Sequence, residues 1–128
     1  MLQSLDVLRL AKGLGEHAMF HQKVVAENVA QSDTPNYRAR DVSSFRDMMS
    51  PDPGTPLRNT RPGHQGGHDA IPRMDAFVDL SAEAAPNGNS VSIEAEMVKS
   101  TEARRQFDLS LAVYRSSLDI LRSALRAR

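Results

Sequence analysis

The sequence predicts a mainly α-helical protein in which long N-terminal and C-terminal helices pair as a coiled-coil-like hairpin. Apolar and small residues recur at alternating steps of three and four in both terminal segments, and the segment between them is rich in proline and glycine. We expect the 128 residues to form one structural unit. Its parts are an N-terminal helix with a Thr-Pro turn and a short extended arm (1–45), a long irregular or partly disordered middle segment (46–90) and a C-terminal helix (91–128).

The first predicted helix covers about residues 3–31 and ends before Pro35, which cannot continue a helix. Gly13 and Gly15 each cost about 1 kcal/mol of helix propensity relative to alanine, so the helix is expected to be weak in isolation. Its seam has the spacing of a coiled coil and is built mostly from small residues, so a partner backbone can come close. The seam residues are Leu8, Ala11, Gly15, Ala18, Gln22, Val25 and Val29.

The middle segment differs in composition from both ends. It holds six of the seven prolines and five of the seven glycines, with no sustained period of 2 or 3.6 residues. Such a stretch buries too little apolar surface to offset the entropy of ordering it. We therefore expect a flexible segment, with a short ordered piece around residues 71–80.

The last helix is predicted from about residue 92 to 127, with Ser90 or Ser92 as its cap. At 1.5 Å per residue it would span roughly 50 Å. Its predicted packing seam again alternates steps of four and three. The seam residues are Ile93, Met97, Ser100, Arg104, Phe107, Leu111, Tyr114, Leu118, Leu121 and Leu125.

A second apolar face on the same helix decides how the chain is expected to behave. Leu109, Val113, Ile120 and Ala124 follow helical spacing but are rotated away from the first seam. These residues either lie under the middle segment in a monomeric bundle or pack against other subunits. We favour other subunits, because the middle segment supplies few side chains able to cover an apolar stripe.

Composition and motifs argue against several other functions. Sixteen basic and sixteen acidic residues cancel, which does not favour a nucleic-acid binder, and cysteine is absent. The N-terminus lacks the pattern of a cleaved secretory signal. His17 and His21 are four residues apart, but no zinc-protease pattern accompanies them, so we expect surface or interface histidines. We expect no enzyme activity, no cofactor, no metal and no small-molecule substrate.

Two motifs carry a resemblance to a known family. The stretch NVAQSDTPNYRARDVSSF, residues 28–45, resembles the N-terminal signature Asn-(Ile/Val)-Ala-Asn-x-x-Thr-Pro-Gly-Tyr of bacterial flagellar rod and hook proteins. Gln31 and Asn36 replace the second Asn and the Gly, and Asn tolerates the left-handed backbone that a Gly adopts. The stretch NGNSVSIEAEM, residues 87–97, is similar to the second block of the basal-body rod family at Gly88, Asn89, Val91, Ile93 and Glu96.

The resemblance implies a structural subunit of the flagellar basal-body rod, in its proximal part. Its terminal helices would self-assemble into a helical, torque-transmitting tube that serves motility. The chain would leave the cytoplasm through the flagellar type III export apparatus without a cleaved signal peptide, and reach the rod in the periplasmic space. Its partners would be itself, other rod subunits, the rod-base adaptor FliE and the membrane-ring protein.

If the chain is a rod subunit, the turn and arm motif is expected to make packing contacts. We predict that the extended arm lies across a neighbouring subunit or helix, with Tyr37 and Phe45 as apolar anchors and the charged residues as directional polar contacts. The motif residues are Asn28, Ala30, Thr34, Pro35, Tyr37, Arg38, Arg40, Asp41 and Phe45. The alternative function is a cytoplasmic helical adaptor or export chaperone, which would be a self-contained bundle with one apolar groove and no extended arm.

Overall fold

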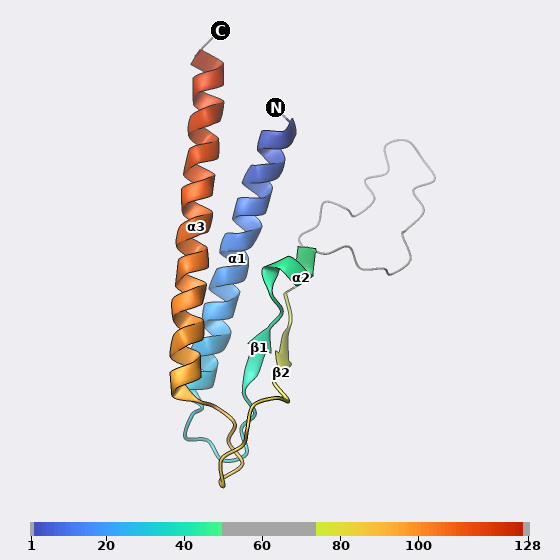
Figure 1. Ribbon diagram of the computed structural model, residues 1–128, viewed down its shortest axis with the longest axis vertical. Helices are drawn as coiled ribbons and strands as arrows, with labels where there is room; N and C mark the ends of the chain where they lie inside the picture. Colours follow the sequence, from blue (N-terminus) through green and yellow to red (C-terminus); the bar gives the residue numbers. More distant parts are fainter. Residues whose placement is uncertain (1, 50–73, 127–128) are drawn as a thin grey trace, which may run out of the picture.

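Two long antiparallel helices dominate the computed structural model, which describes residues 2–49 and 74–126 (Figure 1). Helix α1 covers Leu2–Ala30 and helix α3 covers Ile93–Arg126. Both chain termini lie at the same end of the helix pair, and the connections leave from the other end. This confirms the predicted mainly α-helical hairpin. Most of the predicted flexible segment, residues 50–73, lies outside the described residues.

The helices meet along two lines of residues that repeat every seven positions. Ala11, Ala18 and Val25 are buried on α1. The buried residues on α3 are Glu96, Ala103, Ser110 and Ser117. This is the repeat of a coiled coil. Small side chains on both lines let the backbones approach closely: a Cβ added to Gly15 would lie 2.9 Å from the Ser110 Oγ atom.

The contact line on α3 differs from the one that apolar spacing predicts. Large apolar residues of the predicted seam flank the contact or face away from it, because the close approach near Gly15 leaves room only for small side chains. Val29 on α1 is 41% exposed as well. The exposed residues of the predicted α3 seam are Ile93, Met97, Arg104, Leu111, Tyr114 and Leu125, whereas Ser100, Phe107, Leu118 and Leu121 are half-buried.

The arm folds back along α1 and forms a small sheet with part of the middle segment (Figure 1). Strand β1, Arg40–Val42, pairs antiparallel with strand β2, Ala76–Val78, and Asp41 lies opposite Phe77. Strand β2 falls inside the piece around residues 71–80 that we expected to be ordered. A short helix α2, Phe45–Met49, follows β1.

Local signals set the boundaries of these elements. The Ser92 Oγ atom accepts a hydrogen bond from the Ala95 N–H at 3.4 Å, so Ser92 is the N-cap of α3, one of the two predicted candidates. Asn36 adopts φ +61° and Gly88 adopts φ +80°, both in the left-handed region. Asn36 therefore takes the backbone conformation expected of it.

The second apolar face of α3 remains largely accessible. Leu109 is 50% exposed and Ile120 is 61% exposed, while Ala124 is exposed and Val113 is half-buried. The described residues of the chain therefore leave most of this stripe uncovered. No helix within residues 2–49 and 74–126 combines the length and hydrophobicity that a membrane span requires.

Candidate functional site

The two sequence motifs meet at the end of the helix pair from which the connections leave. We call this region the motif junction: residues 28–42, which end α1 and form the turn and β1, and residues 87–99, which form the turn before α3 and its first two turns (Figure 1). Antiparallel pairing brings the end of α1 beside the start of α3. The junction is held by polar groups that are largely withdrawn from water.

Asn28 is the centre of the junction and is fully buried. Its Nδ2 atom donates to the Arg40 carbonyl oxygen at 2.7 Å and to the Glu96 carboxylate at 3.0 Å. Its Oδ1 atom accepts from the Arg40 N–H at 3.0 Å and from the Tyr37 hydroxyl at 3.2 Å. One side chain therefore joins α1 to the turn, to β1 and to α3, and its hydrogen-bonding capacity is fully used.

Glu96 is 2% exposed and carries a charge into this junction. Its carboxylate lies 3.3 Å from the Lys99 Nζ atom, which also lies 2.9 Å from the Asp41 carboxylate. Burial opposes the charge on Lys99, but the hydrogen bonds and charges of Asp41 and Glu96 outweigh that effect and raise the Lys99 pKa. A buried carboxylate is tolerated only when it is paired and hydrogen-bonded, and both conditions are met here.

Asn89 holds the turn that follows α1 from the opposite motif. Its Nδ2 atom lies 2.9 Å from the Gln31 carbonyl oxygen and 2.8 Å from the carbonyl oxygens of Ser32 and Thr34. Carbonyl groups withdrawn from water in a turn need hydrogen-bond donors, and one amide supplies them here. Asn89 therefore fixes a turn that lies 55 to 58 residues earlier in the chain.

Ser90 ties the arm to the same turn. Its Oγ atom accepts from the Ala39 N–H at 2.9 Å, and its own N–H donates to the Tyr37 carbonyl oxygen at 3.0 Å. Both Ala39 and Ser90 are buried. The backbone of the arm is thus fixed directly by the segment that precedes α3.

Two histidines fix the next part of the arm to α1. His17 is 2% exposed, which corrects the expected surface or interface position, and its Nε2 atom donates to the Ser43 carbonyl oxygen at 2.8 Å. The Phe45 ring lies 5.7 Å from the His17 ring. The His21 Nε2 atom lies 3.6 Å from the Asp41 carboxylate, and burial lowers the His21 pKa although Asp41 acts in the opposite direction. Within the described part of the chain, no three His, Cys, Asp or Glu side chains are grouped so as to hold a metal ion.

Comparison with known proteins gives the family. A protein of Agrobacterium fabrum named flagellar basal body rod protein FlgB is 32% identical over 119 residues, which are 90% of this chain and 89% of that protein. A protein of the same name from Cereibacter sphaeroides is 24% identical over 88% of this chain and 93% of its own length. No family model matches the chain. The chain belongs to the FlgB family of flagellar basal body rod proteins.

In this FlgB-family chain, the predicted motif residues divide into two groups. Asn28 is buried, and Tyr37, Asp41 and Phe45 are half-buried against their own chain. The arm therefore lies on α1 of the same molecule, and any contact it makes with a neighbouring subunit stays a prediction. The exposed members of the motif are Ala30, Thr34, Pro35, Arg38 and Arg40, and Arg40 lies 3.7 Å from Glu27.

Sequence reasoning missed how the two motifs of this FlgB-family member bind each other. Asn89 and Glu96 were recognised only as matches to a family pattern, and Lys99 and Ser90 received no role in binding the first motif. The signal was present, because antiparallel helices of similar length must bring the end of the first beside the start of the second. Polar residues that follow one helix and precede the other are then candidates for mutual hydrogen bonds.

Proposed function

We propose that the chain is a structural, non-enzymatic subunit of the proximal rod of the bacterial flagellar basal body. The observation that carries this proposal is the relationship to FlgB rod proteins over 90% of the chain. The described residues support it physically, because large apolar side chains remain exposed along both long helices. These include Leu10, Met19, Met97, Leu109, Ile120 and Leu125. Exposed apolar side chains in such number favour association with other subunits.

The motif junction suits a subunit that has to transmit torque. Asn28 and Glu96 hold the two helices in one register, since a shift along the helices would leave a buried amide and a buried carboxylate without partners. The arm is joined to the same hub through Arg40 and Tyr37. The helices and the arm therefore act as one rigid unit at this end, which is what load transfer between packed subunits requires.

The route and neighbours of the subunit follow from the same proposal. The chain is exported by the flagellar type III apparatus without cleavage of a signal peptide, and it assembles in the periplasmic space. It contacts further copies of itself, other rod subunits, the rod-base adaptor FliE and the membrane-ring protein. Terminal helices that pack laterally then build a helical tube, because contacts between unlike surfaces form an open helical assembly when their rotation does not close a ring.

Release of the arm from α1 tests this function. The Tyr37→Ala plus Phe45→Ala variant loses the hydroxyl that binds Asn28 and the ring that lies on His17. We expect normal export and no incorporation into the rod, measured as secreted subunit against subunit in isolated basal bodies. Asp33→Ala is the control, because Asp33 lies outside the predicted arm contacts, is exposed and has no side-chain hydrogen bond or ion pair within the described residues. Normal incorporation of the double variant contradicts a role of the arm in assembly.

A further inference from the structure

The turn before α3 contains an asparagine followed directly by a glycine, Asn87 and Gly88. Asn87 is exposed to solvent. Asparagine side-chain amides are chemically labile, because the backbone nitrogen of the next residue can attack the side-chain carbonyl carbon. Glycine has no side chain to hinder this attack. The turn therefore contains the pair of residue types at which the attack is least obstructed.

The structure explains why residue 88 is a glycine. Gly88 adopts φ +80°, and an added Cβ atom would overlap the Asn36 side-chain oxygen. Any residue with a side chain is strained in this backbone conformation. The geometry that lets the turn lie against the first motif thus places the least hindered neighbour directly after Asn87.

Hydrogen bonds restrain the groups that the reaction would use. The Gly88 N–H donates to the Ala85 carbonyl oxygen at 2.8 Å. The Asn87 Oδ1 atom accepts from the Asn89 N–H at 3.0 Å, and the Asn87 main-chain carbonyl accepts from the Asn36 N–H at 3.0 Å. The attacking Gly88 nitrogen must lose its proton, and without that proton it cannot keep its bond to Ala85. The closed motif junction therefore opposes the reaction, and opening of the junction removes this restraint.

We propose that Asn87 is a self-modification site, at which the chain converts asparagine to aspartate or isoaspartate while the motif junction is open. The Gly88 nitrogen forms a bond to the Asn87 Cγ atom, and the bond from Cγ to the side-chain nitrogen breaks. Ammonia leaves with the proton that the Gly88 nitrogen loses, and a succinimide ring remains. Water then opens the ring: attack at Cγ gives aspartate, and attack at the main-chain carbonyl carbon gives isoaspartate. Water is the only co-reactant.

The two products differ in their effect on the junction. Aspartate keeps the length of the backbone and offers a carboxylate oxygen to the Asn89 N–H. Isoaspartate carries the main chain through the former side chain, so an extra methylene group enters the backbone at residue 87. That group displaces the carbonyl that accepts from the Asn36 N–H or the turn formed by Gly88. The isoaspartate form therefore cannot close the junction as the unaltered chain does.

Peptide mass spectrometry of the full-length chain tests the site, because the reaction replaces an amino group by a hydroxyl group. The chain is incubated at mildly alkaline pH, both under native conditions and in guanidinium, and then digested with trypsin. We expect Asn87 to convert at least tenfold faster in guanidinium. Under native conditions the Asn28→Ala variant should convert faster than the unaltered chain, since Asn28 holds the junction closed. Equal rates in native and denatured chains, or no conversion in guanidinium, overturn the proposal.

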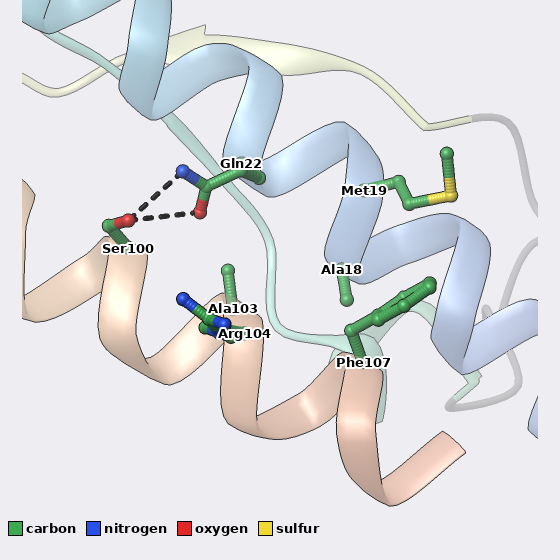
Figure 2. Close-up of a pocket in the computed structure, with 7 residues that line it drawn as sticks. All are labelled: Ala18, Met19, Gln22, Ser100, Ala103, Arg104 and Phe107. Atoms are coloured by element: carbon green, nitrogen blue, oxygen red, sulfur yellow. Dashed lines mark hydrogen bonds between the residues drawn. The ribbon is translucent and has the colours of Figure 1, made fainter. Parts of the chain in front are cut away.

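Two other amides serve as references in the same samples. Asn36 is followed by Tyr37, whose side chain hinders the attack. The Gln22 amide is hydrogen-bonded to the Ser100 hydroxyl at 3.0 Å in the native chain (Figure 2), and a glutamine must close a larger ring, which forms more slowly. We expect both to convert at least tenfold more slowly than Asn87 in guanidinium. Equal conversion of all three amides contradicts a specific site at Asn87.

Refolding tests the predicted difference between the products. The two modified forms are separated by chromatography and returned to native conditions, and Asn87→Asp is the matched variant of the aspartate form. We expect Asn87→Asp to unfold thermally near the midpoint of the unaltered chain, and the isoaspartate form to unfold several degrees lower. Equal midpoints for the aspartate and isoaspartate forms contradict the assigned effect on the junction.

Discussion

The two ends of the helix pair differ in which side chains are buried and which are exposed. At the motif junction, Asn28, Asn89 and Glu96 are buried and their polar groups are bonded within the chain. At the end that carries the termini, Ile120 and Leu125 are more than half exposed. Polar groups withdrawn from water need partners of fixed geometry, whereas apolar side chains accept any close-packed surface. The junction therefore determines the shape of the subunit, and the far end is available for other subunits.

The largest expected effect is the loss of stability when Asn28 is substituted at the motif junction, compared with a substitution at the far end. Asn28→Ala leaves the Arg40 N–H and the Glu96 carboxylate short of a buried partner, so we expect a loss of about 3–5 kcal/mol in the free energy of unfolding. Thermal unfolding followed by circular dichroism, at a concentration where the unaltered chain is helical, measures this loss. Ile120→Ser is the matched control at the far end and should change stability by less than about 0.5 kcal/mol. If both variants lose the same free energy of unfolding, the motif junction does not stabilise the chain more than the far end does.

A backbone substitution in the turn before α3 should have the next largest effect. Gly88 has φ +80°, and an added Cβ atom would overlap the Asn36 side-chain oxygen. We expect Gly88→Ala to destabilise the chain by about 2 kcal/mol, since a left-handed backbone and a steric overlap both oppose it. Asn36→Gly keeps the left-handed turn and should stay within about 1 kcal/mol of the unaltered chain. Denaturant titration compares the two, and a neutral Gly88→Ala variant would show that the turn is free to rearrange.

A smaller effect tests the close approach of the helices midway between the two ends. Gly15→Ala gains helix propensity of up to about 1 kcal/mol but places a methyl group 2.9 Å from the Ser110 Oγ atom. We expect the two effects nearly to cancel. In a Ser110→Ala background the crowding is absent, so Gly15→Ala should then stabilise the chain by about 0.5–1 kcal/mol. The same effect in both backgrounds would mean that the helices do not meet as closely as described.

The smallest expected effect is the pH dependence of stability that His21 contributes at the edge of the motif junction. Burial lowers the His21 pKa from its usual 6.5, so the unfolded chain takes up this proton at higher pH than the folded chain does. His21 therefore leaves stability unaffected above about pH 6.5, and stability declines as the pH falls below that value. Thermal midpoints between pH 7.5 and pH 5 should fall less steeply for His21→Gln than for the unaltered chain. If the thermal midpoints of both proteins fall equally with pH, a group other than His21 causes the loss of stability.

The sequence predicted the extent of the two helices and the turn well, because their signals are local. The helices end within about two residues of the expected positions, and Pro35, Asn36 and Ser92 act through their own backbone and side-chain preferences. The contact line on α3 could not be read from hydrophobicity, since its buried residues are Glu96, Ala103, Ser110 and Ser117. A search for large apolar side chains selects their neighbours Met97 and Leu111 instead.

The polar junction was not predictable residue by residue, because each of its bonds depends on where the two helices stop relative to each other. Asn28 donates to Glu96 across 68 positions of sequence, and no local pattern encodes that distance. The arm was correctly expected to lie across a helix. That the helix belongs to the same chain follows from His17 and Asn28, whose inward positions emerge only from the packed structure.

The bonds from Asn89 to the turn after α1 have a consequence for the order of events during translation. The ribosome synthesises the first helix and its turn long before Asn89, and Glu96 and Lys99 follow later still. Until roughly three quarters of the chain has been made, the turn lacks the amide that holds it and Asn28 lacks the carboxylate that it binds. The nascent N-terminal segment is therefore not fixed, and only a nearly complete chain can become rigid.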